Sequence, residues 1–346
     1  MLVTRQPVLR RFWYPVMPLE LLEDGPKPFR LLGEDIVLWR TTDGRLVALE
    51  DRCCHRTAKL SAGWVSDSRI TCGYHGWAYD ETGRCVMVPQ NPELARGRRV
   101  RRFHSQARYS YAWVALDEPL DAIPEFSEAG DPAFRVVPEF FEVWRCAGLR
   151  VMENSFDNAH IQFVHRNTFG DQKDPVPAPP SIVENAGGFE MSADVKVWNN
   201  DQQKSNLKDS GHYTTRHLTS SWYRPFLRKL HIRYPSGLVH AIVTAATPID
   251  DHHSQICQWA YRNDSEADAP AAGIIAFDRQ VTLEDKAILE STDPDVPLSL
   301  DSGEEFHMPS DRPGMVMRRQ LLALLAAHGE TEARGREAGV VMDPAD

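Results

Sequence analysis

The stretch from Cys53 to Trp77 reads CCHRTAKLSAGWVSDSRITCGYHGW and holds cysteine and histidine in two short groups. One residue separates Cys53 from His55, sixteen residues follow, and two residues separate Cys72 from His75. Thiolates and imidazoles are strong metal ligands, and each group supplies one of each. Glycines beside the second group let the backbone approach a bound centre closely. The stretch therefore predicts a metal centre held between two loops.

The spacing decides between two kinds of centre. Two thiolates and two imidazoles are the ligands of a Rieske [2Fe-2S] cluster, in which the cysteines bind one iron and the histidines the other. A structural zinc site is the alternative. A one-residue gap is tight for two ligands of one zinc, whereas a Rieske cluster sends the ligands of each loop to different irons. The pattern therefore favours a cluster, and only Cys53, not Cys54, keeps the one-residue gap to His55.

Length and charge restrict the remaining possibilities. The 346 residues suggest about two domains. A formal net charge of -10 disfavours nucleic acid or an anionic membrane as a partner. No segment approaches a membrane-spanning length of uninterrupted apolar residues, and the start lacks a secretory apolar run. Six cysteines without a scaffold pattern fit a reducing compartment, so we expect a cytoplasmic protein.

The chain divides into a β-rich part and a mixed part. Residues 29–116 show short strands between turns, with a hairpin at 36–50 around Asp43-Gly44. Asp117-Glu118-Pro119 marks a boundary. We therefore predict an α+β protein with an all-β Rieske domain at 1–120 and a catalytic domain at 121–346.

The second part shows helical and strand patterns in turn. Residues 149–170 are compatible with a helix, whereas the proline-rich residues 174–188 predict a loop. Residues 189–262 alternate and predict an antiparallel sheet, and the apolar spacing of residues 274–289 predicts a late helix.

A second group of metal-ligand residues lies in ENSFDNAHIQFVHR, residues 153–166. On a straight helix His160 and His165 would point about 140° apart, so a joint site requires the helix to end or distort before His165. Two histidines and one carboxylate leave open positions on iron for oxygen and substrate. Taken alone, ordinary helix-surface or core histidines are the alternative, and the upstream cluster motif favours the metal site.

The carboxylate ligand need not be close in sequence. In VTLEDKAIL, Asp285 stands at core-facing spacing with Val281, Ile288 and Leu289, whereas Glu284 points about 100° away. Asp285 is therefore the better candidate.

With both groups in view, the chain resembles the α subunits of Rieske non-haem iron oxygenases. Asn154, Asp157, His160 and His165 match the family pattern, as does the late Glu284-Asp285 pair. The resemblance implies a helix-grip-like catalytic domain, with His160, His165 and Asp285 as ligands of a mononuclear Fe(II). It implies that Asp157 bridges His160 to His75 of a neighbouring subunit. The shorter, homotrimeric members, such as dicamba O-demethylase, vanillate demethylase and caffeine N-demethylases, are most similar.

The resemblance also implies the reaction and the partners. O2 would be the co-substrate, and NAD(P)H would supply electrons through a separate reductase, with or without a ferredoxin. We expect monooxygenation of a small aromatic, heteroaromatic or polycyclic substrate, by hydroxylation or oxidative O- or N-demethylation. A ring cis-dihydroxylating dioxygenase is one alternative, and a Rieske electron-transfer protein is another. Asn154 could contact the ligand, and five aromatic residues are candidates for the pocket or for ordinary core: Phe156, Trp222, Tyr234, Trp259 and Phe277.

Overall fold

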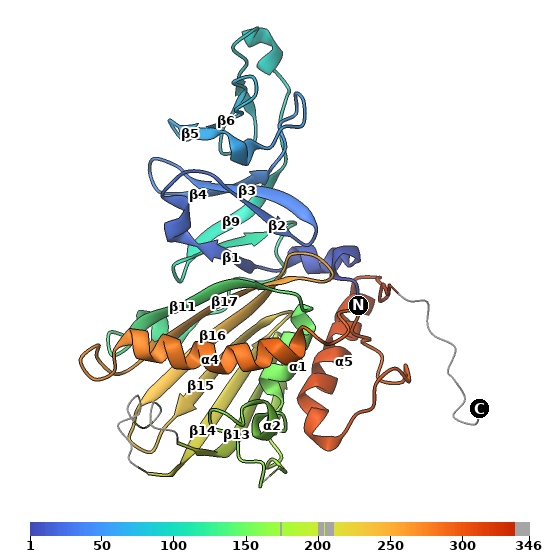
Figure 1. Ribbon diagram of the computed structural model, residues 1–346. Helices are drawn as coiled ribbons and strands as arrows, with labels where there is room; N and C mark the ends of the chain where they lie inside the picture. The colour runs from blue at the N-terminus through green and yellow to red at the C-terminus, as the bar shows by residue number, and fades with distance from the viewer. Residues whose placement is uncertain (174, 200–203, 205–210, 336–346) are drawn as a thin grey trace. The chain divides into compact units, whose positions relative to one another are not determined.

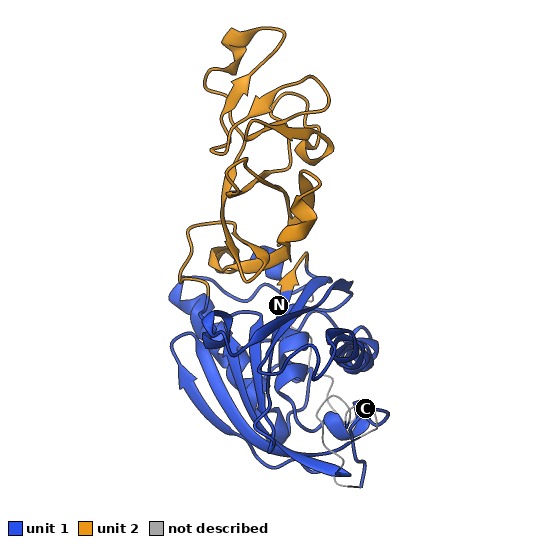
Figure 2. Ribbon diagram, turned by 90° about the vertical axis from the view of Figure 1, so that its left-hand side faces the viewer, with its two compact units in different colours: residues 1–6, 124–246, 251–346 blue, residues 7–123, 247–250 orange. Residues whose placement is uncertain are grey.

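The chain folds into two compact units, which Figure 2 shows in different colours. The computed structural model describes residues 1–173, 175–199, 204 and 211–335, so residues 336–346 of the predicted catalytic domain lie outside the described residues. The N-terminal unit comprises residues 7–123 and 247–250. The C-terminal unit comprises residues 1–6, 124–246 and 251–346. The C-terminal unit is made of three separate stretches of the chain, so a single boundary at residue 120 cannot describe both units. The predicted domain bounds stay a prediction.

The N-terminal unit is built from β-strands (Figure 1). Its larger sheet has the order β1-β10-β9-β4-β3-β2 with antiparallel pairing. The predicted turn between β3 and β4 contains Gly44, whose φ of 84° suits glycine. The strands are β1 (Tyr14–Pro18), β2 (Lys27–Leu31), β3 (Glu34–Arg40), β4 (Leu46–Glu50), β9 (Arg102–Arg108) and β10 (Tyr111–Ala115).

A smaller sheet in the same unit carries the metal-ligand stretch. Its order is β5-β6-β7-β8, and a turn that contains Gly83 joins its last two strands. The strands are β5 (Trp64–Ser66), β6 (Arg69–Thr71), β7 (Ala78–Tyr79) and β8 (Cys85–Met87). Both units also contain short 3-10 helices: η1 (Val3–Arg5), η2 (Pro7–Arg11), η3 (Leu19–Leu22), η4 (Leu60–Ala62), η5 (Pro92–Ala95), η6 (Ser127–Gly130) and η7 (Pro309–Asp311).

The C-terminal unit is organised around one large sheet. Within the described residues its order is β11-β17-β16-β15-β14-β13-β12, and the strands pair antiparallel. The predicted sheet at 189–262 is thereby confirmed. The strands are β11 (Arg135–Trp144), β12 (Ser181–Asn185), β13 (Gly188–Trp198), β14 (Tyr213–Tyr223), β15 (Leu227–Arg233), β16 (Val239–Pro248) and β17 (Ser254–Arg262).

Helices cover one face of this sheet (Figure 1). Helix α4 packs Ile274 against Val137 of β11 and Ala260 of β17. Its outer residues Leu283 and Ile288 are exposed, although their spacing is that of a core face. The helices are α1 (Gly148–Phe156), α2 (Ile161–Val164), α4 (Ala271–Leu289) and α5 (Arg312–Ala327).

The predicted proline-rich loop at 174–188 is only partly correct. Described residues up to Pro180 are irregular, but Ser181–Asn185 forms β12 at the edge of the sheet. The prolines end at residue 180, so the backbone N–H groups beyond it are free to pair with β13. Asp174 lies outside the described residues. Among the helices that the structure describes, none is long and apolar enough to cross a membrane.

A buried ion-pair network joins α1 to α5. Arg318 of α5 is 3% exposed and donates hydrogen bonds to Glu153 of α1 and to Glu305. Arg150 of α1 completes the network through Glu153 and Glu305. Burial raises the pKa of Glu305, but the hydrogen bonds from Arg150 and Arg318 hold it below its ordinary value. The Glu305 carboxylate is therefore ionised and depends on its arginine partners.

Replacing Arg318 with leucine should reduce the free energy of unfolding by about 3 kcal/mol, because Glu153 and Glu305 each lose one of their two arginine partners. The neighbouring Arg319 provides the control: its side chain is 60% exposed and pairs with the exposed Glu184. Arg319→Leu should cost less than about 1 kcal/mol. Urea unfolding followed by circular dichroism measures both variants. Equal losses would contradict the structural role given to the buried network.

Candidate functional site

Two loops of the N-terminal unit carry the predicted cluster ligands. The first follows β4, where the Cys53 N–H donates to the Ala58 carbonyl at 2.8 Å. The second follows β6, where the Gly76 N–H donates to the Cys72 carbonyl at 3.0 Å. Gly76 has a φ of 74°, a left-handed conformation that this tight turn requires and that glycine adopts without strain. The local sequence thus folds each ligand pair into its own compact loop.

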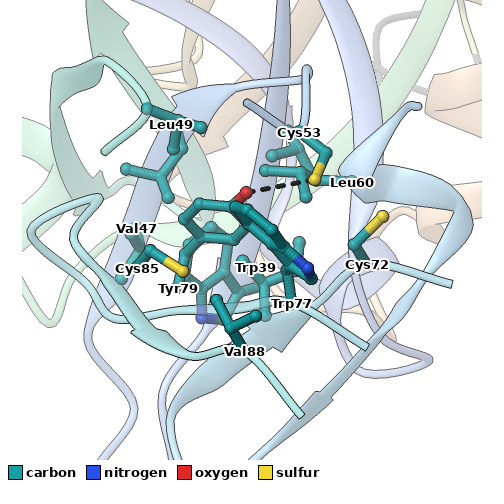
Figure 3. Close-up of a cluster of buried hydrophobic side chains, with 13 residues drawn as sticks. Trp39, Val47, Leu49, Cys53, Leu60, Cys72, Trp77, Tyr79, Cys85 and Val88 are labelled. Carbon is teal, nitrogen blue, oxygen red and sulfur yellow. Dashed lines mark hydrogen bonds between the residues drawn. The ribbon is translucent and has the colours of Figure 1, made fainter. Parts of the chain in front are cut away.

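The four predicted ligand side chains come together. Cys53 and Cys72 are 2% and 1% exposed, and Figure 3 shows both sulfurs beside the aromatic cluster around Tyr79. The rings of His55 and His75 lie 4.5 Å apart between centroids. Within the described residues the Nδ1 atoms of both histidines are buried and have no hydrogen-bond partner. Two buried thiols and two unsatisfied ring nitrogens fit the ligand set of a Rieske cluster.

Burial distinguishes the two adjacent cysteines, although Tyr79 contacts both. Its hydroxyl lies 3.0 Å from Cys53 Sγ, within the buried cluster, and 3.3 Å from Cys54 Sγ. Cys54 is exposed, whereas Cys53 belongs to the core that also contains Cys72. This burial supports Cys53 as the ligand. Three further cysteines, Cys85, Cys146 and Cys257, are buried in the core.

The second predicted site lies where the first helix of the C-terminal unit breaks. The expectation that 149–170 could form one helix is wrong, because α1 ends at Phe156. Asp157 caps α1, His160 precedes the short helix α2, and His165 follows it. Asp157 and His160 therefore do not share a helix face. The predicted break before His165 is confirmed, and it frees the two imidazoles from the divergence that a straight helix would impose.

The break lets three potential ligand atoms converge. His160 Nε2 and His165 Nε2 lie 3.2 Å apart, and they lie 3.4 Å and 3.3 Å from Asp285 Oδ1 of α4. Ligand atoms about 2.1 Å from a metal and at right angles lie roughly 3 Å apart. Asp285 Oδ1 is buried and has no hydrogen-bond partner among the described residues. The three side chains therefore fit one face of a mononuclear iron.

Asp157 and Asn154 lie against this triad. Asp157 Oδ2 is 3.6 Å from His160 Nδ1, and its carboxylate also accepts the N–H groups of Ala159 and His160. Asn154 hydrogen-bonds Asp285 and lines the adjacent cavity. Burial lowers the pKa of His160, but Asp157 and Asp285 raise it to about 9. The carboxylates thus create the negative potential that a divalent cation needs.

Glu284 of α4 also contacts the site. The sequence spacing placed Glu284 away from the site, but its Oε2 lies 3.0 Å from His165 Nδ1 and accepts a hydrogen bond from Thr168 Oγ1. His165 lies beneath the helix with one ring nitrogen facing Glu284 and the other facing Asp285. Glu284 and Asp285 point in different directions from α4, and each reaches a different nitrogen of the His165 ring. Glu284 thereby orients the ring and selects its tautomer.

The triad opens onto a cavity of about 150 Å³. Its polar members include Ser220, Thr244 and Gln258 on the sheet, and two guanidinium groups, Arg216 and Arg228. None of the five aromatic residues considered for the pocket lines it, and all five are buried core residues. The apolar wall comes mainly from the sheet and α4: Met191, Val195, Val197, Leu218, Leu230, Ile232, Ile242, Ile256, Val281 and Leu289.

A second group of histidine and carboxylates lies beside the cavity, and sequence spacing did not predict it. The register shift in β11 places Glu139 against Asp278 of α4, and His240 Nε2 lies 3.3 Å from Asp278 Oδ2. Burial and then Asp278 raise the pKa of Glu139, and burial raises the pKa of Asp278 to about 6. Burial thus favours the protonated forms of both carboxyl groups. Gln258 donates to Glu139 and accepts from Thr244.

Two family models match the chain. The Rieske [2Fe-2S] domain matches residues 12–103, and the vanillate O-demethylase oxygenase C-terminal domain matches residues 144–327. Methylxanthine N1-demethylase of Pseudomonas putida is 33% identical over 97% of this chain and 94% of its own length. A putative toluene-4-sulfonate monooxygenase system iron-sulfur subunit of Comamonas testosteroni is 33% identical over 47% of this chain and 48% of its own.

Solved structures show the same architecture. Pseudomonas putida CBB5 NdmA with caffeine has a TM-score of 0.82 at 31% identity, with 94% of each chain covered. Dicamba monooxygenase bound to 3,6-dichlorosalicylic acid has a TM-score of 0.79 at 22% identity, over 92% of this chain and 98% of that chain, and shows the likeness of fold alone.

A cluster domain followed by a vanillate-demethylase-type domain defines an iron-dependent oxygenase. The chain belongs to the family of Rieske non-haem iron oxygenase α subunits. It is a terminal oxygenase with a Rieske cluster and a mononuclear iron, and it uses O2 with electrons that come from NAD(P)H through a separate reductase. The predicted α+β class is confirmed. A Rieske electron-transfer protein is excluded, because the second family model covers residues 144–327.

Proposed function

We propose that the protein oxidatively demethylates a small aromatic or heteroaromatic substrate in the cavity beside His160, His165 and Asp285. The convergence of these three ligand atoms on the cavity is the observation that carries the proposal. The similarity to methylxanthine N1-demethylase, which is 33% identical over 97% of the chain, supports demethylation over ring dihydroxylation. A methyl group hydroxylated there would leave as formaldehyde.

Two separate sets of residues would hold the two metal centres. Cys53, Cys72, His55 and His75 would hold the cluster, and the triad would hold the iron. When bound, the iron supplies the position at which O2 is activated. Glu284 would keep His165 oriented, and Asn154 would hold the Asp285 carboxylate in place through its hydrogen bond. The aliphatic wall would exclude water and orient the methyl group toward the triad.

Electron transfer is proposed to cross a subunit interface in a homotrimer. Asp157 would link His160 to the partner subunit's His75, and its position 3.6 Å from the Nδ1 of His160 supports this role. That Nδ1 is buried and has no hydrogen-bond partner among the described residues. Exposed apolar residues on the C-terminal unit support an oligomer, since Phe163, Val176 and Met308 border a groove of about 430 Å³. The cytoplasmic location, with its supply of NAD(P)H, belongs to the same proposal.

Formaldehyde release tests the demethylation. The holoprotein with a surrogate reductase, NADH and O2 should release formaldehyde from at least one member of a panel of methoxylated and N-methylated aromatic compounds. We expect one molecule of formaldehyde for each NADH consumed in coupled turnover. With isotopically labelled O2, one labelled atom should appear in formaldehyde trapped as it forms, and none in the demethylated product. A diol product without formaldehyde would instead establish the dioxygenase alternative. Reduction of the cluster without oxidation of any compound would contradict the proposed substrate class.

A further inference from the structure

Arg228 places an unpaired positive charge in the cavity. It lies on β15, and its guanidinium lines the cavity beside the triad. Its Nε is buried without a hydrogen-bond partner, and no residue that the structure describes forms an ion pair with it. The ring of Phe156 lies 5.7 Å from its guanidinium carbon. A cation–π contact at this distance is weak compensation for a desolvated charge.

Two buried arginines of the C-terminal unit, Arg262 and Arg318, have carboxylate partners that Arg228 lacks among the described residues. Arg262 is 1% exposed and donates to the carboxylate of Asp264. Arg318 is 3% exposed and pairs with Glu153. A buried charge is normally retained only with a partner, because removal from water costs several kcal/mol. The fold supplies acceptors for these two guanidiniums but not for Arg228, which faces the cavity.

Asp285 acts electrostatically on Arg228 but forms no ion pair with it. Burial lowers the pKa of Arg228 to about 10, and Asp285 is the charge that opposes this lowering. Asp285 already lies 3.4 Å from His160 and 3.3 Å from His165, and it accepts a hydrogen bond from Asn154. Its charge is thus directed at the proposed iron. The guanidinium of Arg228 therefore remains a positive charge on the wall of the cavity that the sheet forms.

We propose that Arg228 binds the carboxylate of the substrate, so that the protein acts on methylated aromatic or heteroaromatic acids. A guanidinium presents parallel N–H donors that match a carboxylate in a bidentate pair. The aliphatic side chains around it, among them Leu230 and Ile256, would enclose the ring that carries this carboxylate. The proposal rests on the proposed function and specifies its substrate class. It also accounts for the unpaired guanidinium, because the carboxylate of the ligand would neutralise its charge.

Binding measurements on the holoprotein test the pairing without turnover. The probes are 2-, 3- and 4-methoxybenzoate, each compared with its uncharged methoxybenzamide by isothermal titration calorimetry. At least one acid should bind more tightly than its amide by roughly tenfold or more, as expected for a charge-assisted pair. Arg228→Gln should weaken that acid roughly tenfold to a hundredfold while changing the amide little. Arg228→Lys should retain part of the preference.

Arg233→Gln is the matched control, because Arg233 lies on the same strand but is exposed. It removes the same charge and should leave both affinities unchanged. Equal binding of every acid and its amide by the unmodified protein would overturn the proposal, as would equal losses in the two variants. Retained amide binding by Arg228→Gln shows that the cavity is folded. Formaldehyde release from uncharged compounds, unaffected by Arg228→Gln, would overturn this inference and leave the demethylation proposal standing.

Discussion

Replacing Asp285 with alanine should abolish substrate oxidation while leaving the cluster intact. The variant removes the oxygen that faces His160 and His165 at 3.4 Å and 3.3 Å, so two neutral imidazoles would remain to hold the iron. Iron should fall from about three to about two per chain, since a Rieske cluster contains two. The residual activity should be at least roughly a thousandfold lower, because the position at which O2 is activated is lost.

The visible spectrum and iron content measure this outcome together. A retained cluster spectrum shows that the N-terminal unit is folded, so that loss of activity reports on the second centre. Asp301→Ala is the control, because it removes an exposed carboxylate from the same unit. It should keep full iron and full activity. An Asp285→Ala protein with unchanged iron and turnover would remove Asp285 from the proposed ligand set.

Replacing Asp157 with asparagine should keep both metal centres and disconnect them. Asparagine retains a side-chain carbonyl that can accept the Ala159 N–H, which Asp157 accepts at 2.6 Å. It loses the negative charge that lies 3.6 Å from His160 Nδ1. In single turnover the pre-reduced cluster should remain reduced, and product formation should slow by roughly a hundredfold or more. Unchanged turnover would eliminate Asp157 as the bridge.

Mixed oligomers test whether the electron crosses between subunits. Co-expressed Cys72→Ser and Asp285→Ala chains would each lack one centre, so neither alone should be active. If the cluster of one chain serves the triad of its neighbour, the mixture should recover part of the activity. No recovery in verified mixed oligomers would place electron transfer within one chain.

The local chemistry could be predicted from sequence because its parts are close along the chain. Each cluster loop carries its own Cys and His within four residues, and short hydrogen bonds such as Gly76 N–H to the Cys72 carbonyl close the loop. The hairpin turn at Gly44 was likewise predictable, because a left-handed φ favours glycine. The need for a helix break before His165 followed from helix geometry alone.

The sequence by itself thus determined the two metal-ligand patterns and the α+β class, whereas the tertiary structure decided how distant side chains meet. Glu284 and Asp285 reach His165 from more than a hundred residues away, and only the packing of α4 shows that both face it. The apolar periodicity of α4 predicted that Glu284 points away from the site, because periodicity within one helix does not show where the His165 imidazole lies. The unpaired charge of Arg228 has the same origin. A guanidinium is identical in any sequence, and only the surrounding fold decides whether an acceptor or a cavity lies opposite it.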